Sequence, residues 1–340
     1  MIKDNLKTGV LLINLGTPDK PEEQDVKIYL KEFLNDPRVI DIPDFSRYLL
    51  VNYIIIPKRY KNTTRLYKEV WTDNGSPLMF YTMKSAKLLQ EKLGDKFDVQ
   101  LAMRYRLPSI ESALKKFKNN GIGRIIILPL FPQYASASVG TVHQKVMKII
   151  SGWQVIPDIK FISEFHDHPQ YIKACCDVST EFNLNEFDHF LFSYHGLPER
   201  QIKKADQSGI CLNDKCCNTI DGRNLYCYRA QCYSTTRLIA QQLNIKEENY
   251  SVCFQSRLGK EPWIKPYTDK VLIDLAAKGK KKLLVFSPSF VADCLETLYE
   301  IGVEFDELFK ENGGEKVQLV PGLNDHPQWI TALKEIILNN

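Results

Sequence analysis

The sequence predicts an α/β protein of two similar lobes, each a parallel sheet flanked by helices. Short runs that are apolar nearly throughout alternate with amphipathic stretches, a pattern typical of strands buried on both faces of a sheet and of the helices that connect them. The two halves of the chain also repeat each other in pattern. With 340 residues, the chain is long enough to form two such units.

Six runs have the composition of buried strands and end near Gly or Pro. They are residues 10–15, 99–103, 125–130, 189–193, 251–255 and 283–287. Residues 109–119 and 267–278 have the helical periodicity of crossover connections.

An internal repeat sets the domain organisation. Residues 99–133 and 251–290 share the order strand, Arg-containing loop, Pro, helix, Gly turn, apolar strand and Pro. HDHPQYIKA (166–174) and NDHPQWITA (324–332) nearly match, and VLLINLGTP (10–18) resembles FLFSYHGLP (190–198). We therefore expect an N-terminal lobe over 1–165 and a C-terminal lobe over 166–340, whose last helix could pack back on the first lobe.

Composition and charge exclude several classes of protein. The chain is 44% hydrophobic and 25% charged with a net charge of +4, which is ordinary for a soluble globular protein and gives no reason to expect nucleic acid as a partner. No secretion signal precedes the first predicted strand, and the longest apolar run, 48–57, is half the length of about 20 residues that a spanning helix needs. An odd number of cysteines, nine, favours a reducing compartment and a cytoplasmic location.

The polar residues that follow the predicted strands are the candidate site. His195 follows strand 189–193, and Asp293, Glu296, Glu300 and Glu304 form an acidic stripe if 292–304 is a helix. Ligands of such sheets sit beyond the carboxyl ends of the strands. A structural histidine and a solvated helix face are the alternative interpretations.

A neutral imidazole facing carboxylates can bind a divalent metal or accept protons. The sequence has no GxGxxG, GxxxxGK[ST], GxSxG or HExxH motif, so nucleotide, acyl-transfer and zinc-protease chemistry have little support. The residues alone predict a two-lobed α/β protein with a His/carboxylate cleft.

Seven motifs, in order along the chain, resemble those of the ferrochelatase family. They are NLGTP (14–18), GSPL (75–78), MRY (103–105), FPQY (131–134), FSYHGLP (192–198), PW (262–263) and ETLYEIGVEF (296–305). The resemblance covers about residues 8–335. It implies two Rossmann-like lobes of the chelatase type and an enzyme that inserts Fe²⁺ into protoporphyrin IX with release of two protons, the last step of haem biosynthesis. Coproporphyrin III as substrate and a non-catalytic metal- or tetrapyrrole-binding protein are the alternatives.

The resemblance also implies roles for individual residues. His195 and Glu296 would be the catalytic pair that holds the substrate iron, with Asp293 and Glu300 on a path for protons or metal. The expected porphyrin-binding residues are Leu15, Tyr67, Ser76, Arg104, Tyr105, Tyr134, Trp263 and Phe290. Many relatives carry His where this chain has Cys294, which puts a second-ligand role of that position in doubt.

An apolar lip over the porphyrin is expected at about residues 45–60. With Lys58, Arg59 and Lys61 behind it, the lip could touch a membrane, so a peripheral position at the inner membrane is a further expectation. From the residues alone, 49–56 could equally be an ordinary buried helix or strand.

Five cysteines lie within residues 211–232: Cys211, Cys216, Cys217, Cys227 and Cys232. Thiolate-rich sites select iron–sulfur clusters or zinc. Certain bacterial ferrochelatases carry a similar internal set, and this resemblance predicts a [2Fe–2S] cluster, with zinc or no metal as alternatives. Four ligands suffice, so one cysteine is spare. The adjacent Cys216 and Cys217 can rarely bind the same cluster comfortably, and the sequence does not decide between them.

Overall fold

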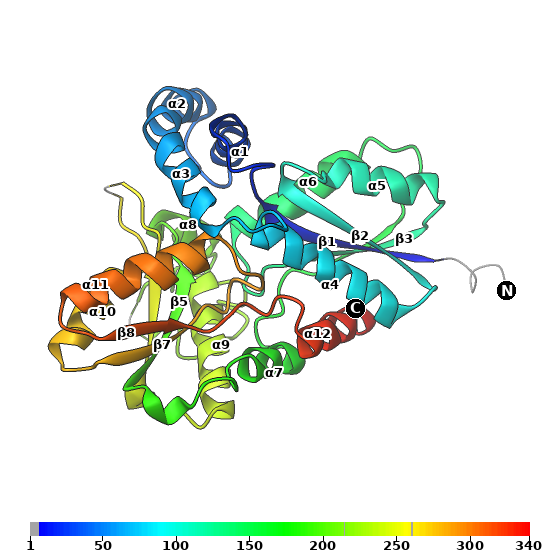
Figure 1. The fold of residues 1–340 in the computed structure, drawn as a ribbon. Helices are drawn as coiled ribbons and strands as arrows, with labels where there is room; N and C mark the ends of the chain where they lie inside the picture. Colours follow the sequence, from blue (N-terminus) through cyan, green and yellow to red (C-terminus); the bar gives the residue numbers. More distant parts are fainter. Residues whose placement is uncertain (1–6, 214, 260) are drawn as a thin grey trace. The chain divides into compact units, whose positions relative to one another are not determined.

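The computed structural model describes residues 7–213, 215–259 and 261–340 (Figure 1). The chain divides into two compact units. The first comprises residues 1–131, 135–164 and 333–340, and the second comprises residues 132–134 and 165–332.

The first unit contains a parallel four-stranded sheet in the order β2-β1-β3-β4. Its strands are β1 (Thr8–Gly16), β2 (Phe97–Tyr105), β3 (Arg124–Pro129) and β4 (Asp158–Phe161). Its helices are α1 (Glu23–Leu34), α2 (Asp44–Leu49), the π-helix η2 (Leu50–Ile55), α3 (Ile56–Val70), α4 (Pro77–Leu93), α5 (Ile110–Asn119), the π-helix η3 (Ser136–Gly140) and α6 (Thr141–Ile150).

Helices cover both faces of this sheet (Figure 1). On one face, α5 and α6 bury Leu114, Phe117 and Val146 against Leu11 and Ile127 of the central strands. On the other face α4 packs along β1 and β2, and the Asn14 amide donates a buried hydrogen bond to Thr82 of α4 (3.0 Å). The continuous apolar runs of the strands therefore reflect burial on both faces.

The second unit contains a parallel sheet in the order β6-β5-β7-β8. Its strands are β5 (His189–His195), β6 (Tyr250–Gln255), β7 (Lys282–Phe286) and β8 (Lys316–Leu319). Its helices are α7 (Pro169–Asp177), the 3₁₀-helix η4 (Leu184–Glu186), α8 (Glu199–Ala205), α9 (Tyr228–Gln242), the 3₁₀-helix η5 (Glu247–Asn249), α10 (Thr268–Ala277), the π-helix η6 (Glu296–Phe305) and α11 (Asp306–Glu311). A last helix, α12 (Pro327–Leu338), begins in this unit, and its residues from Leu333 onward belong to the first.

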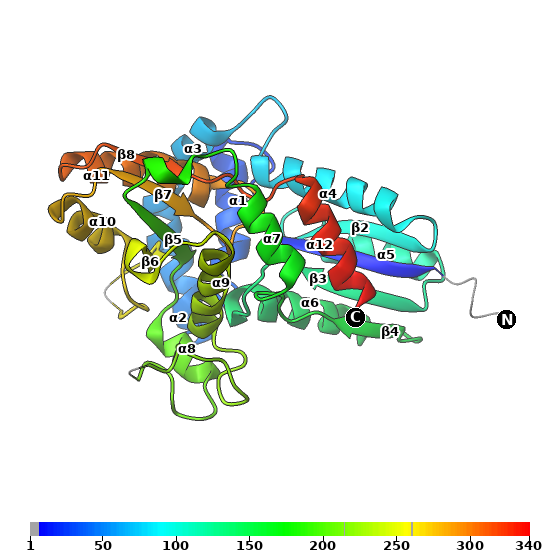
Figure 2. The ribbon, with the colours of Figure 1, turned by 90° about the horizontal axis from the view of Figure 1, so that it is seen from below.

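Two groups of helices sandwich the second sheet. Leu272 of α10, Ile301 of η6 and Phe309 of α11 share a buried cluster with Leu191 and Val285. On the opposite face α7 and α9 lie side by side (Figure 2).

The two sheets have the same strand order, which confirms the α/β fold of two similar lobes predicted from the repeat. Corresponding details agree as well. A Cβ atom at Gly16 would lie 2.0 Å from the Tyr105 carbonyl oxygen, and one at Gly196 would lie 2.8 Å from that of Gln255. In each unit, glycine permits the strand to approach the end of its neighbour.

Three details differ from the sequence-based expectation. Strands β4 and β8 were not predicted, because each has four residues and lies at a sheet edge, where the apolar run is short. The segment predicted as a helix over 292–304 becomes helical only near Glu296, and Asp293 lies in the loop before it. Residues 49–56, left open between an exposed lip and a buried element, are helical and partly exposed.

Candidate functional site

His195 is the last residue of β5, with its side chain half-buried. Its Nδ1 lies 2.6 Å from the carbonyl oxygen of Gly196. Because a carbonyl oxygen only accepts, Nδ1 carries the proton of the neutral ring, and Nε2 keeps the lone pair that can take a proton or a metal ion.

The electrostatic surroundings keep this imidazole neutral. Burial lowers the pKa of His195, and the negative charge of Glu296 opposes that shift only in part. A neutral imidazole is the form required of a proton acceptor or metal ligand.

The Trp263 ring lies beside the His195 ring. Its ring centroid lies 6.4 Å from that of His195, and its Nε1 donates to the Leu258 carbonyl (3.0 Å). A Cβ atom at Gly196 would lie 3.2 Å from the Trp263 ring. Glycine at this position therefore lets the tryptophan approach the strand end.

The side chain of Gln255 connects β5 to the acidic π-helix. Gln255 pairs with His195 in the sheet register, and its Oε1 accepts from the Ser193 hydroxyl (2.7 Å). Its Nε2 donates to the carbonyl of Glu296 (3.1 Å) and to the carboxylate of Glu300 (3.0 Å). The sequence analysis missed this role, although Gln255 ends a strand at the position that the repeat pairs with MRY.

Glu300 is held in an environment that disfavours its charge. Ser256 and Gln255 both donate to its Oε2, at 2.6 and 3.0 Å. Burial, followed by the charge of Glu296, raises the pKa of Glu300 to about 7. Ser256 donates from a left-handed backbone conformation (φ 65°), which a non-glycine residue rarely adopts.

A π-helix carries these carboxylates. Glu296 and Glu300 lie in η6, and Glu304 lies at its exposed end. The wider turn of a π-helix brings residues four apart near one face. Asp293 is not part of this row, because its carboxylate accepts from the Gly322 amide (2.9 Å) and the Asn324 side chain (2.7 Å) in the preceding loop.

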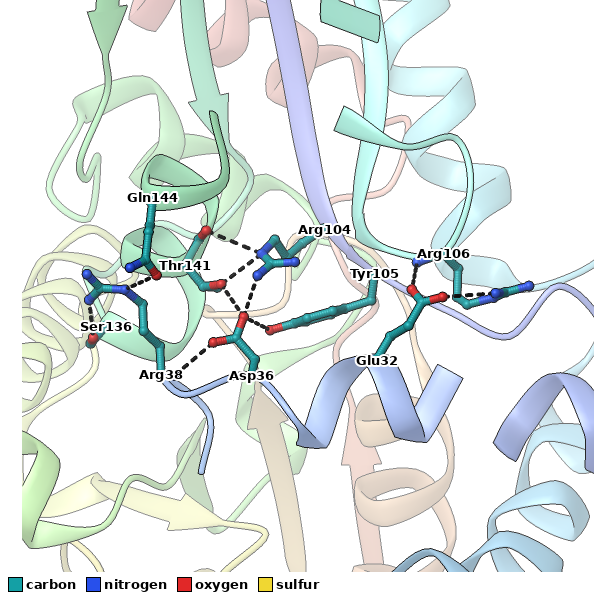
Figure 3. Close-up of polar contacts among 9 residues, drawn as sticks. All are labelled: Glu32, Asp36, Arg38, Arg104, Tyr105, Arg106, Ser136, Thr141 and Gln144. Atoms are coloured by element: carbon teal, nitrogen blue, oxygen red, sulfur yellow. Dashed lines mark hydrogen bonds and ion pairs between the residues drawn. The ribbon is translucent and has the colours of Figure 1, made fainter. Parts of the chain in front are cut away.

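The predicted porphyrin-binding residues of the first unit occupy varied surroundings. Tyr67 and Ser76 are buried, and Leu15 is half-buried. Arg104 and Tyr105 belong to a polar cluster around buried Asp36 (Figure 3).

Asp36 accepts from three side chains: those of Arg104, Tyr105 (3.1 Å) and Thr141 (2.5 Å). Burial and the Asp36 charge raise the pKa of Tyr105, so its hydroxyl stays a donor. The sequence analysis missed Asp36, whose only signal is its place in the NDP turn after α1.

The family model named Ferrochelatase matches residues 7–340. The chain belongs to the ferrochelatase family. Curated ferrochelatases of Coxiella burnetii (strain Dugway 5J108-111) and Legionella pneumophila (strain Lens) are 47% and 45% identical to it, each over 98% of this chain and 94% and 99% of the relative. The predicted family and class of enzyme, a metal chelatase, are confirmed.

Two solved structures share the fold of this chain. One is SirB from Bacillus subtilis with Fe³⁺, with a TM-score of 0.55 and 12% sequence identity over 98% of this chain and 95% of that one. The other is the sirohydrochlorin chelatase SirB from Bacillus subtilis subspecies spizizenii in complex with cobalt, with a TM-score of 0.52 and 12% sequence identity over 96% of this chain and 92% of that one. They support the chelatase-type fold.

The remaining site candidates of the chain lie in the second unit. The Tyr134 ring packs on Tyr226 with 5.3 Å between centroids, and its backbone amide donates to Gln231 (2.6 Å). Phe290 follows β7 in a turn closed by the Ser287 carbonyl (3.0 Å). Cys294 is buried, and desolvation raises the pKa of its thiol, which favours the neutral form.

Four of the five clustered cysteines form two close pairs. Cys211 Sγ lies 3.6 Å from Cys227 Sγ, and Cys216 Sγ lies 3.7 Å from Cys217 Sγ. Cys232 is fully buried in α9 beside Tyr228. All nine cysteines are free, so the structure contains no disulfide at any of them.

Proposed function

We propose that this chain inserts Fe²⁺ into protoporphyrin IX to give protohaem, the last step of haem biosynthesis. The observation that carries the proposal is the half-buried imidazole of His195, which burial keeps neutral although the negative charge of Glu296 acts on it; the same Glu296 charge helps to raise the pKa of Glu300. Insertion requires that two pyrrole N–H protons leave and that the metal exchange its water ligands. A proton acceptor together with carboxylate oxygens meets both needs.

In this proposal His195 accepts a pyrrole proton at Nε2 and Glu296 guides the iron, although the two roles could be exchanged. Glu300, with its pKa of about 7, can then take up and release protons near neutral pH. Asp293, in the loop before η6, is the proposed first residue of a path along which protons or metal reach Glu300. Each iron that enters the ring replaces two protons, so charge is conserved.

The side chains proposed to contact the porphyrin in the second unit are Tyr134, Trp263 and Phe290. Those proposed in the first unit are Leu15, Tyr67, Ser76, Arg104 and Tyr105. For Tyr105 the contact would be through the ring, because its hydroxyl is bound to Asp36.

A porphyrin-fluorescence assay with Fe²⁺ or Zn²⁺ tests the proposal. We expect His195→Ala and Glu296→Gln each to lower kcat on the order of 10²-fold or more, the range of general acid–base contributions. His326→Ala is the matched control, because this histidine lies in the turn before α12, where its ring accepts from the Gln328 amide. Normal rates in both site variants would refute the site.

The same assay decides the porphyrin. Protoporphyrin IX carries two carboxylates and coproporphyrin III carries four. We expect the higher kcat/KM with protoporphyrin IX, and a preference for coproporphyrin III would reassign the substrate.

We further propose that Cys211, Cys216, Cys217 and Cys227 hold a [2Fe–2S] cluster. Sulfur atoms that share one tetrahedral metal at about 2.3 Å lie about 3.8 Å apart, close to the two separations of 3.6 and 3.7 Å. Burial raises the pKa of the Cys211 thiol to about 11, so metal binding must displace protons. The fully buried Cys232 is the spare cysteine in this assignment.

Anaerobic purification with iron, sulfide and zinc analysis tests the cluster. We expect visible charge-transfer absorption in the wild type and in Cys232→Ser, and its loss in Cys227→Ser. Stoichiometric zinc in a colourless protein would replace the cluster by a zinc site. Loss of colour in Cys232→Ser would overturn the choice of ligands.

A cytoplasmic location with peripheral membrane contact completes the proposal. The structure has no helix, among the residues it describes, of the length and apolarity that spanning requires. The support for contact is the apolar lip at residues 45–60, whose side chains Phe45 and Tyr53 are exposed.

A further inference from the structure

The first turn of α9 connects the cysteine site to the strand that carries His195. Cys227 precedes the helix, and Tyr228 and Arg229 are its first two residues. Successive residues of a helix project about 100° apart around its axis. Tyr228 and Arg229 can therefore reach different neighbours from one rigid turn.

Arg229 faces the cysteine site. Its Nη1 donates to Cys217 Sγ (3.1 Å) and its Nε to the Lys265 carbonyl (3.1 Å), while its guanidinium lies over the Tyr233 ring at 4.9 Å. Within the part of the chain that the structure describes, this guanidinium forms no ion pair with a carboxylate. An anionic thiolate site would supply the missing countercharge.

Tyr228 faces the candidate catalytic histidine. Its hydroxyl donates to the His195 carbonyl oxygen (2.9 Å), and its side chain is buried. Burial raises the pKa of this tyrosine, so the hydroxyl stays a donor. The His195 imidazole is itself bonded to the next carbonyl, that of Gly196. The backbone that Tyr228 holds is thus the backbone that orients the ring.

We propose that Tyr228 is a positioning residue for His195 and that the first turn of α9 couples the state of the cysteine site to it. A change at Cys217 or Cys227 displaces the turn, and the displacement reaches the His195 carbonyl through the tyrosine hydroxyl. The coupling is reciprocal, so a ligand at His195 also changes the cysteine site. The inference rests on the proposed function for its consequence in catalysis.

A double-mutant cycle tests the coupling with wild type, Tyr228→Phe, Cys217→Ser and the double variant. The readouts are kcat and KM for metal insertion and the NMR resonance of the His195 ring, assigned with His195→Ala. Tyr250→Phe is the matched control, since it removes a tyrosine hydroxyl from β6.

We expect Tyr228→Phe to lower kcat about tenfold with little change in KM, the scale of lost support to a site residue, and to move the His195 resonance. Cys217→Ser should move the same resonance, and the double variant should show no more than the Tyr228→Phe effect. Additive effects, or a resonance that Cys217→Ser leaves in place, would overturn the coupling.

Arg229→Gln perturbs the same turn without removing a cysteine, which keeps the test decisive if another variant fails to fold. It too should move the His195 resonance, and an unmoved resonance counts against the coupling. If the wild type inserts no metal into either porphyrin, the proposed function fails, whereas the resonance comparison still decides the coupling because it needs no turnover.

Discussion

The fold favours the protonated form of the Glu300 carboxyl group, whereas the proposed chemistry needs this group also to lose its proton. Burial raises its pKa to about 7, so the folded state favours the protonated form. A group of this kind stabilises the fold below its unfolded pKa, and that stabilisation is lost as the pH rises through the folded value.

Glu300→Gln should therefore raise the free energy of unfolding at pH 8, by up to about 3 kcal/mol. The gain should shrink between pH 7 and pH 4.5 and vanish below, because both proteins are then neutral at this position. Urea unfolding across this pH range measures the difference, and the variant should also insert metal more slowly. Equal stability at pH 8 would contradict the environment assigned to Glu300.

Gly196 is a second position where a single substitution should change both stability and activity. A methyl group there would lie 2.8 Å from the Gln255 carbonyl oxygen and 3.2 Å from the Trp263 ring. We expect Gly196→Ala to lower the free energy of unfolding by about 1–3 kcal/mol, the usual cost of overpacking, and to lower kcat by displacing His195.

Thermal unfolding and the fluorescence assay measure the two effects of Gly196→Ala. Gly152→Ala is the control, because its added methyl group would lie 3.6 Å from the Ile149 carbonyl, an ordinary contact. If both variants behave alike, the crowding at Gly196 has no consequence.

At the scale of elements, α2, η2 and the start of α3 form the exposed lip. Phe45 and Tyr53 are 74% and 67% exposed, and Lys58, Arg59 and Lys61 are exposed nearby. Apolar side chains beside basic ones are typical of helices that lie in a membrane interface.

We expect the wild type to co-sediment with vesicles of phosphatidylglycerol and phosphatidylethanolamine. Serine at both Phe45 and Tyr53 should weaken this binding at least tenfold, because two aromatic rings leave the interface. A double change of Val155 and Ile156 to serine is the matched control, since these are 78% and 61% exposed on another segment. Equal binding of both double variants would contradict a role for the lip.

A helix was predicted from the sequence at the position of η6, but the type of helix and the residue where it begins were not. The acidic residues of 293–304 fit an α-helical spacing, yet the structure forms a π-helix from Glu296 and leaves Asp293 in a loop. Among the contacts that hold this segment are the hydrogen bonds from Gln255 to the Glu296 carbonyl and from Asn324 to the Asp293 carboxylate. Both join residues distant in the sequence.

At the scale of the molecule, the repeat was the strongest signal. Six of the eight strands found in the described residues were predicted, and the two similar lobes are confirmed by their identical strand orders. The missed strands, β4 and β8, have four residues each, too few for a hydrophobic period to be distinct.

The sequence by itself determined the fold class, the family and the strand ends from which His195 and Gln255 project, because these follow from local apolar periodicity and from motifs. Only the tertiary structure decided the neutral state of His195, the pKa of Glu300, the Asp36 cluster and the pairing of the four cysteines. Those properties arise from desolvation and from hydrogen bonds between segments far apart in the chain, which no local pattern records.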